Sequence, residues 1–250
     1  MKLITLNTWC GKVYEPLEKF IKEQAKDTDI FCFQEVRNGP YTNQPEEEKE
    51  VADLFNKLEK MLPDFKDYFT DYDQENPRGV GLATFVRNTI NITKIESSTI
   101  LFQKEVSHVK IGENGTSYPR VIQETTLENP KISIYNFHGV AGGLTKKRDT
   151  PERDLQTKRI LEILNKYSDS KILVGDFNLS PDTNAITSFE QQMNNLIKES
   201  TYTTTRSSFY DRKETLPFAD YIFTSKDLQV KNFKVFPDEV SDHLALSVEI

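Results

Sequence analysis

Six short segments of this chain share one pattern: an apolar run typical of a buried strand adjoins a carboxylate, an amide or an imidazole. They are Leu6-Asn7-Thr8, Phe33-Gln34-Glu35-Val36, Tyr135-Asn136-Phe137-His138, Val174-Gly175-Asp176-Phe177-Asn178, Ala219-Asp220-Tyr221 and Ser241-Asp242-His243-Leu244. A strand buried on both faces avoids charge, so a charged residue at its tip needs a reason. In α/β sheets, ligands collect where strands run out into loops. The pattern therefore predicts an α/β fold with a polar site at a sheet edge.

Strand and helix patterns alternate along the chain without a repeat. Strands are predicted over residues 2–6, 30–33, 81–87, 90–95, 106–111, 120–127, 131–137, 171–174, 221–224 and 244–250. Helices are predicted over residues 15–26, 46–62, 150–164 and 188–196. Because no change of composition marks a linker, we expect one domain spanning residues 1–250.

The composition excludes several classes of protein. The 11 prolines and 10 glycines are too few for a collagen-like chain, and 36% hydrophobic residues are too many for a disordered one. No apolar run approaches the roughly 18–20 residues of a membrane span, so none is expected. The net charge of −7 has the wrong sign for a protein that coats nucleic acid without sequence preference.

The cysteines indicate a reducing environment. Cys10 and Cys32 are too few for a disulfide framework or a thiolate zinc site, and both have apolar neighbours. We therefore expect two buried structural cysteines. With no secretory signal after Met1, the sequence favours a cytoplasmic protein.

Each polar strand tip, taken alone, also has an ordinary structural explanation. Asn7 could cap a turn, and Asp176 and Asn178 could bond their own backbone. The histidines favour a functional explanation, because two of the three in the chain, His138 and His243, lie at these tips.

The residue types at the tips indicate hydrolysis at phosphorus. Hard oxygen ligands such as Glu35, Asp242 and the amide of Asn7 suit Mg²⁺ or Mn²⁺ rather than zinc. Asp176 could orient or deprotonate a water for in-line attack while Asn178 donates to a phosphate oxygen. No GxSxG, GxGxxG or Walker motif supports a serine hydrolase or a nucleotide cofactor.

In this order and spacing, the six segments resemble the endonuclease/exonuclease/phosphatase superfamily, whose members include exonuclease III, pancreatic deoxyribonucleases and tyrosyl-DNA phosphodiesterases. The resemblance extends from Asn7 to His243, and the Gly-Asp-Phe-Asn and Ser-Asp-His runs are its most specific parts. It implies a four-layer α/β/β/α sandwich, in which two mainly antiparallel sheets are flanked by helices.

The resemblance also implies roles for individual residues. The implied metal ligands are Asn7, Glu35 and Asp242, with Glu35 the principal one. The implied catalytic residues are His138, Asp176, Asn178, Asp220 and His243. Asp176 would handle the water, Asp220 would pair with His243, and Arg120 would bind the phosphate.

Three functions follow from this interpretation. The first is a monomeric, Mg²⁺- or Mn²⁺-dependent phosphoesterase that cleaves a phosphodiester in a nucleic acid or a nucleotide-linked substrate, such as a nuclease. The second is a phosphatase or phosphodiesterase acting on a small sugar, inositol or nucleotide phosphate. The third is a non-catalytic binding module, against which the intact set of polar tips counts.

Three loop features bear on the substrate. Residues 142–159 carry six basic and three acidic residues, which could attract an anion or simply form a solvated face. The run Thr203-Thr204-Thr205-Arg206-Ser207-Ser208 could be a phosphate-side loop or a strand and turn. Candidates for aromatic insertion into a nucleic acid are Tyr41, Tyr202, Phe209 and Tyr210.

Overall fold

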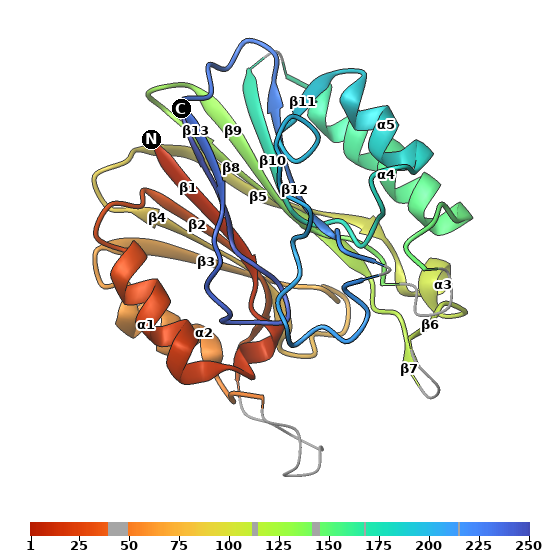
Figure 1. The fold of residues 1–250 in the computed structure, drawn as a ribbon, viewed down its shortest axis with the longest axis horizontal. Coiled ribbons are helices and arrows are strands. Elements are labelled where there is room, and N and C mark those ends of the chain that lie inside the picture. The colour runs from red at the N-terminus through yellow and green to blue at the C-terminus, as the bar shows by residue number, and fades with distance from the viewer. Residues whose placement is uncertain (40–49, 112–114, 142–145, 168, 215) are drawn as a thin grey trace.

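Two six-stranded sheets pack face to face, and helices lie on the outer side of each (Figure 1). This computed structural model describes residues 1–39, 50–111, 115–141, 146–167, 169–214 and 216–250. The layer order is helix, sheet, sheet, helix, which confirms the predicted α/β/β/α sandwich.

The first sheet has one parallel pair of strands among antiparallel neighbours. In spatial order its strands are β13 (Asn232–Val235), β14 (Leu246–Glu249), β1 (Lys2–Asn7), β2 (Ile30–Arg37), β4 (Val80–Arg87) and β3 (Phe65–Asp71). The parallel pair is β1 and β2, joined by the helix α1 (Tyr14–Gln24). A parallel pair needs such a crossover, and it brings the ends of both strands to the same sheet edge.

The second sheet repeats this arrangement. Its strands are β11 (Met193–Asn195), β12 (Asp220–Ser225), β10 (Ser170–Asp176), β9 (Ile132–His138), β8 (Arg120–Leu127) and β5 (Ile92–Leu101). The parallel pair is β9 and β10, and the helix α4 (Pro151–Leu164) joins them. Thr150 accepts a hydrogen bond from the backbone of Arg153, so the predicted N-cap is confirmed.

Alternation along the strands decides which side chains lie between the sheets. In β2, Cys32 belongs to the core shared with the second sheet, whereas Phe31 and Phe33 belong to the core under α1 and α2 (Leu54–Met61). Successive strand residues point to opposite faces, so one strand supplies both cores. Cys10 and Cys32 are buried and free, as expected.

Buried amides connect the two sheets below the polar edge. Gln34 Nε2 donates to Asn136 Oδ1 at 2.7 Å, and Asn136 Nδ2 donates to the carbonyl oxygens of Phe33 at 3.2 Å and Ala83 at 3.3 Å. Gln34 and Asn136 are fully buried. A buried hydrogen-bonded network specifies relative position, so these two strand-tip residues hold β2 against β9.

Several predicted elements are wrong in type or extent. Residues 106–111 are no single strand, because Val106 ends the short helix α3 (Gln103–Val106) and only β6 (Lys110–Ile111) is extended, paired with β7 (Gly115–Thr116). The predicted helix at 188–196 is instead the end of α5 (Asn184–Glu190) followed by β11, which pairs with β12. The strands β3 and β13 were not predicted.

The helix predicted over 46–62 begins only at Leu54, and residues 46–49 lie outside the described part of the chain. A 3-10 turn, η1 (Trp9–Gly11), follows β1. In the described ranges, no helix is both long enough and apolar enough to cross a membrane.

Candidate active site

The ends of the two parallel pairs meet across the gap between the sheets. Asn7 ends β1, Glu35 lies near the end of β2, and His138 and Asp176 end β9 and β10. Asn7 Nδ2 donates to Glu35 Oε1 at 3.0 Å and to Asp176 Oδ2 at 3.1 Å. His138 Nε2 lies 3.5 Å from the same Asp176 oxygen. Four strands from both sheets thus place their polar tips in one cluster.

A bulge in β2 aims the carboxylate of Glu35. The pairing of β2 with β4 shifts between Phe33 and Val36, and Glu35 has a φ of +53°. Residues other than glycine seldom adopt this conformation, and at functional sites it is held by surrounding contacts. Here Thr8 Oγ1 donates to the Glu35 carbonyl at 2.9 Å, and the Glu35 N–H donates to the hydroxyl of Tyr72 at 2.9 Å.

The Gly175–Asn178 segment turns sharply at the end of β10. Gly175 has a φ of +135°, and a Cβ there would lie 1.9 Å from the Phe137 carbonyl oxygen, so only glycine fits. Asn178 N donates to Asp176 Oδ1 at 2.8 Å, which closes the turn. The turn brings Asn178 Nδ2 to 3.1 Å from His138 Nε2.

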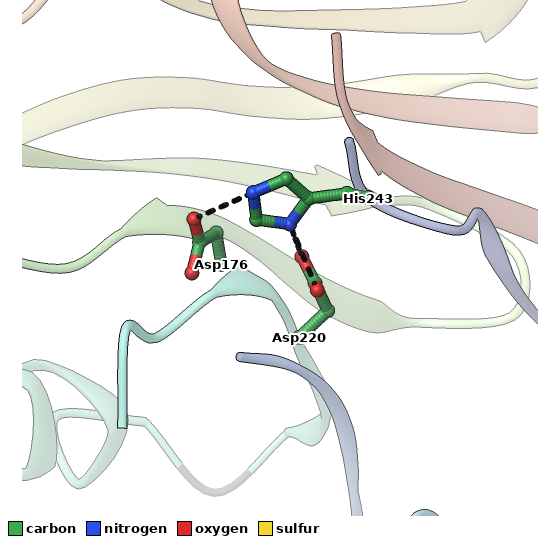
Figure 2. Close-up of side chains that lie close together, drawn as sticks. All are labelled: Asp176, Asp220 and His243. Atoms are coloured by element: carbon green, nitrogen blue, oxygen red, sulfur yellow. Dashed lines mark hydrogen bonds and ion pairs between the residues drawn. The ribbon is translucent and has the colours of Figure 1, made fainter. Parts of the chain in front are cut away.

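His243 lies between two aspartates, as Figure 2 shows. Its Nδ1 is 2.8 and 2.9 Å from the two carboxylate oxygens of Asp220, and its Nε2 is 3.5 Å from Asp176 Oδ2. Thr205 Oγ1 donates to Asp220 Oδ2 at 2.9 Å and orients that carboxylate. The ligand atoms of the three residues lie within 4.8 Å of one another, a spacing that would also suit a metal ion.

Burial and charge act in opposite directions on these groups. Burial by itself raises the pKa of Asp176, but His243, His138 and Arg206 outweigh it and hold this pKa well below its ordinary value. Burial lowers the pKa of His138 to about 3, against the opposing effect of Asp176. Asp176 is therefore ionised and His138 neutral near pH 7.

The charges around His243 and its hydrogen bonds favour different protonation states of the ring. Burial and Arg206 lower its pKa, but Asp220, Asp242 and Asp176 raise it, and the net direction is upward. Arg206 nevertheless donates to His243 Nε2, an arrangement that only the neutral ring accepts. In the protein without substrate the ring proton therefore lies on Nδ1, facing Asp220.

The carboxylates of Glu35 and Asp242 fit a divalent cation. Burial raises the pKa of Glu35, and the charge of Asp242 raises it further. Clustered, partly buried carboxylates are costly without a compensating cation, and oxygen donors are those that Mg²⁺ and Mn²⁺ prefer. Asn7 Nδ2 donates to Glu35 Oε1, while Asn7 Oδ1 accepts from the backbone N–H of Trp9 at 3.0 Å.

Arg120 lies beside the cluster but is bonded to the backbone. It is 2% exposed, its Nε donates to the Gly139 carbonyl at 2.9 Å, and its Nη1 donates to the carbonyls of Tyr118 and Pro119 at 3.1 Å each. In this arrangement Arg120 supports the segment after β9. Its role in phosphate binding stays a prediction.

Sequence reasoning missed Tyr72 and the role of Arg206. The Tyr72 hydroxyl lies 2.7 Å from His138 Nδ1, and Arg206 Nη1 donates to Asp242 Oδ2 at 3.2 Å. Tyr72 follows β3, a strand that the sequence pattern did not reveal. The sequence did offer a signal for Arg206, because this residue lies in the hydroxyl-rich run 203–208.

The basic segment 142–159 is not a uniform patch. Lys147 is buried next to the site, whereas Arg153 is buried against the Val140 carbonyl, to which its Nη2 donates at 3.2 Å. Arg148 pairs with Asp182. Arg159 pairs with Glu105 at 2.7 Å. Residues 142–145 lie outside the described ranges.

The candidate aromatic residues are dispersed. Tyr202 and Phe209 are exposed, and the ring of Tyr210 stacks with the guanidinium of Arg206, 4.1 Å from centroid to Cζ. Tyr41 lies outside the described part of the chain.

Solved structures with the same fold have low sequence identity to this chain. A family protein from Leptotrichia buccalis is 22% identical, with a TM-score of 0.73, over 100% of this chain and 99% of that one. A mannosyl-6-phosphatase from Bacteroides thetaiotaomicron is 16% identical, with a TM-score of 0.74, over 100% of this chain and 98% of that one. The human Nocturnin catalytic domain, with a bound sulfate anion, is 17% identical, with a TM-score of 0.65, over 99% and 92%.

Among curated proteins, none matches the sequence significantly. A sequence model of the Endonuclease/Exonuclease/phosphatase family, however, matches residues 4–243. That span holds all the polar strand tips described above. The chain therefore belongs to the endonuclease/exonuclease/phosphatase family.

Proposed function

We propose that this protein hydrolyses a phosphoester bond by in-line attack of water and that it depends on Mg²⁺ or Mn²⁺. The observation that carries the proposal is the hydrogen bond between His243 Nδ1 and Asp220, with His243 Nε2 3.5 Å from Asp176 Oδ2, next to the carboxylates of Glu35 and Asp242. An acid–base group oriented by a second carboxylate, beside a cluster of oxygen donors, suits phosphoryl transfer to water.

Asp176 is the group that holds and deprotonates the attacking water. Its depressed pKa keeps it ionised, and Asn7, His138 and His243 crowd around its Oδ2 atom. A carboxylate fixed by several partners holds a water in one orientation, which lowers the entropic part of the barrier. Asp220 holds His243 so that its Nε2 faces the reacting centre.

His138 and Asn178 donate to the phosphate oxygens. The Tyr72 oxygen accepts from the Glu35 N–H and lies 2.7 Å from His138 Nδ1, which fixes the orientation of the imidazole ring. His138 Nε2 lies 3.5 Å from Asp176 Oδ2 and 3.1 Å from Asn178 Nδ2, so it faces the reacting centre. Donors fixed before the reaction stabilise the charge that develops on phosphate oxygens.

Glu35 and Asp242 are the residues that would hold the cation, with Asn7 at their side. When bound there, the cation polarises a phosphoryl oxygen and offsets the negative charge of the carboxylates. Members of this family generally use a divalent metal, and the carboxylates gathered here fit that chemistry.

Two substrate classes follow from the sequence: a phosphodiester in a nucleic acid or nucleotide-linked compound, and a small sugar, inositol or nucleotide phosphate. One structural neighbour is a mannosyl-6-phosphatase, and another is a humanized Danio rerio TDP2, so neighbours do not select between the classes. The second class is favoured by two buried cations, Arg206 and Lys147, next to the site. We also propose that the protein is a cytoplasmic monomer, which cell fractionation and gel filtration would test.

A substrate panel tests the proposed function. Nicked, abasic and single-stranded DNA, RNA and soluble phosphate esters would each be incubated with Mg²⁺, Mn²⁺ or a chelator. We expect hydrolysis that requires the metal. Activity that persists unchanged in chelator would contradict the metal dependence, and no hydrolysis of any ester would contradict the function.

A further inference from the structure

Two buried cations border the catalytic cluster, and neither belongs to the residues that the sequence predicts for it. Arg206 is 4% exposed and Lys147 is 5% exposed. Fully buried basic side chains are uncommon unless they have a charged partner or a ligand. Neither lies on the strand tips that form the cluster, since Arg206 lies within the hydroxyl-rich run 203–208 and Lys147 precedes α4.

The guanidinium of Arg206 has an unused donor directed into buried space. Its Nη1 reaches Asp242 Oδ2 at 3.2 Å and contacts His243 Nε2. Its Nε is buried and has no hydrogen-bond partner among the residues that the structure describes. A buried N–H without an acceptor is unfavourable, so this donor points to an acceptor supplied by a ligand.

The ammonium group of Lys147 is likewise incompletely paired. Its Nζ donates to the Phe218 carbonyl at 2.9 Å, and within the described ranges no carboxylate lies at ion-pair distance from it. An ammonium has three donors, so two stay available. Burial lowers the pKa of Lys147 to about 7, with Arg206 adding to the effect, so a bound anion would stabilise its charged form.

The ring of Tyr210 brings the two cations together. The Arg206 Cζ lies 4.1 Å from the ring centroid, and the Lys147 Nζ lies 5.1 Å from it. Stacking on an aromatic ring fixes the plane of a guanidinium and favours positive charge near the ring face. Arg206 and Lys147 thus form one cationic corner, adjacent to His243.

Charge balance indicates what this corner would bind. The cluster contains four carboxylates: Glu35, Asp176, Asp220 and Asp242. A single divalent cation would offset only two of these charges, and the remainder would repel an anionic ester. Arg206 and Lys147 supply the missing two positive charges, and they do so at one side of the reacting centre.

We propose that Arg206 and Lys147 form an anion subsite that binds the terminal oxygens of a phosphate monoester dianion and selects it over a phosphodiester. The inference rests on the proposed phosphoesterase function and narrows its substrate class. A monoester presents three unsubstituted oxygens and two negative charges, whereas a diester presents two oxygens and one charge. Two fixed cations therefore bind the monoester more tightly than the diester.

The experiment compares one pair of esters across matched variants. The esters are p-nitrophenyl phosphate and bis(p-nitrophenyl) phosphate, measured with Mn²⁺ at about pH 6.5, below the pKa of Lys147. The variants are Arg206→Gln and Lys147→Gln, and the control is Lys146→Gln, which removes the same charge from the exposed neighbour of Lys147. We expect each variant to lower kcat/KM for the monoester by about tenfold to a hundredfold, the range for a lost charged hydrogen bond. For Lys147→Gln we expect kcat/KM for the diester to change by less than about threefold. Because Arg206 also contacts Asp242 and His243, Arg206→Gln should lower kcat/KM for both esters, and more for the monoester.

Binding of inorganic phosphate, measured by calorimetry with wild-type protein and both variants, gives a readout that needs no turnover. We expect weaker binding in both variants and unchanged binding in Lys146→Gln. If the wild type hydrolyses no ester of the substrate panel yet binds phosphate through these residues, the proposed function fails while the subsite stands. A wild type that prefers the diester, equal losses on both esters, or unchanged phosphate binding would overturn the subsite. Arg206→Lys, which keeps the charge, should retain more monoester activity than Arg206→Gln, and Lys147→Gln carries the test if Arg206→Gln unfolds.

Discussion

Asp220 and His243 are 23 residues apart in the chain, yet both carboxylate oxygens of Asp220 lie within 2.9 Å of His243 Nδ1. Asp220 begins β12 in the second sheet, and His243 precedes β14 in the first. The pair therefore connects the two layers at the polar edge. Its geometry also leaves His243 Nε2 facing Asp176, as Figure 2 shows.

Replacing Asp220 tests this relationship directly. Asp220→Asn keeps the shape of the side chain but removes the charge that orients His243 and favours its protonation. We expect turnover to fall by about 10²–10⁴-fold, the range for displaced acid–base partners. Steady-state kinetics on the best ester of the panel measures it. Asp182→Asn, at an exposed residue paired with Arg148, is the matched control, and wild-type turnover in Asp220→Asn would show that the pair is not catalytic.

Glu35→Ala tests the metal site. The carboxylate is only partly buried and contributes little to the core, so we expect the fold to persist and most activity to disappear. Calorimetric titration with Mn²⁺ should show weakened binding in this variant, while thermal unfolding changes little. Glu23→Ala, at an exposed residue of α1, serves as the control. Full activity of Glu35→Ala at saturating Mg²⁺ would refute the assignment.

The depressed pKa of His138 predicts a pH-dependent stability. Because this pKa lies near 3 in the folded protein and near 6.5 when unperturbed, the unfolded chain binds more protons between these values. Stability should therefore fall on acidification through this window, by at most about 1.4 kcal/mol per pH unit from this group. Urea unfolding in chelator at several pH values should show that the free energy of unfolding depends less steeply on pH in His138→Gln than in the wild type.

The matched variant for that measurement is His108→Gln, at an exposed histidine that contacts Glu152. In His108→Gln we expect the free energy of unfolding to depend on pH nearly as in the wild type. An equally steep pH dependence in His138→Gln and the wild type would mean that His138 does not stay neutral in the fold.

Gly175→Ala tests the turn that presents Asp176 and Asn178. The added Cβ would clash with the Phe137 carbonyl in a backbone conformation that already favours glycine, so we expect a loss of at least about 3 kcal/mol in the free energy of unfolding. Gly39→Ala measures how much of the loss in the free energy of unfolding comes from the backbone conformation alone. Gly39 has a φ of +106° but nothing within 4 Å of the added Cβ. Similar losses in both variants would show that the clash is relieved at little cost.

The alternation of helices and strands was readable from local pattern, but several pairings were not. The predicted helix over 188–196 was wrong because β11 is extended by pairing with β12, about 30 residues further along the chain. The strand β3 lacked a clear apolar alternation, since it pairs with β4 at the edge of the sheet. Tertiary pairing overrides local preference most readily in such short or edge elements.

The polar strand tips could be found from the sequence because a buried strand tolerates charge only where it ends. This reasoning identified Asn7, Glu35, His138, Asp176 and Asp220, and the structure places all of them at one edge. Their convergence has a topological cause. Each sheet contains one parallel pair with a helical crossover, which brings two strand ends to the same side.

The family, the sandwich and the residue types of the cluster could be predicted from the sequence, because these follow from patterns within short segments. The packed structure was needed to show that Arg120 bonds to backbone carbonyls and that Tyr72, Arg206 and Lys147 border the cluster. The side chains of Tyr72, Arg206 and Lys147 hydrogen-bond to partners that lie tens of residues away along the chain. A contact between distant segments depends on how the two sheets pack, and no local spacing records it.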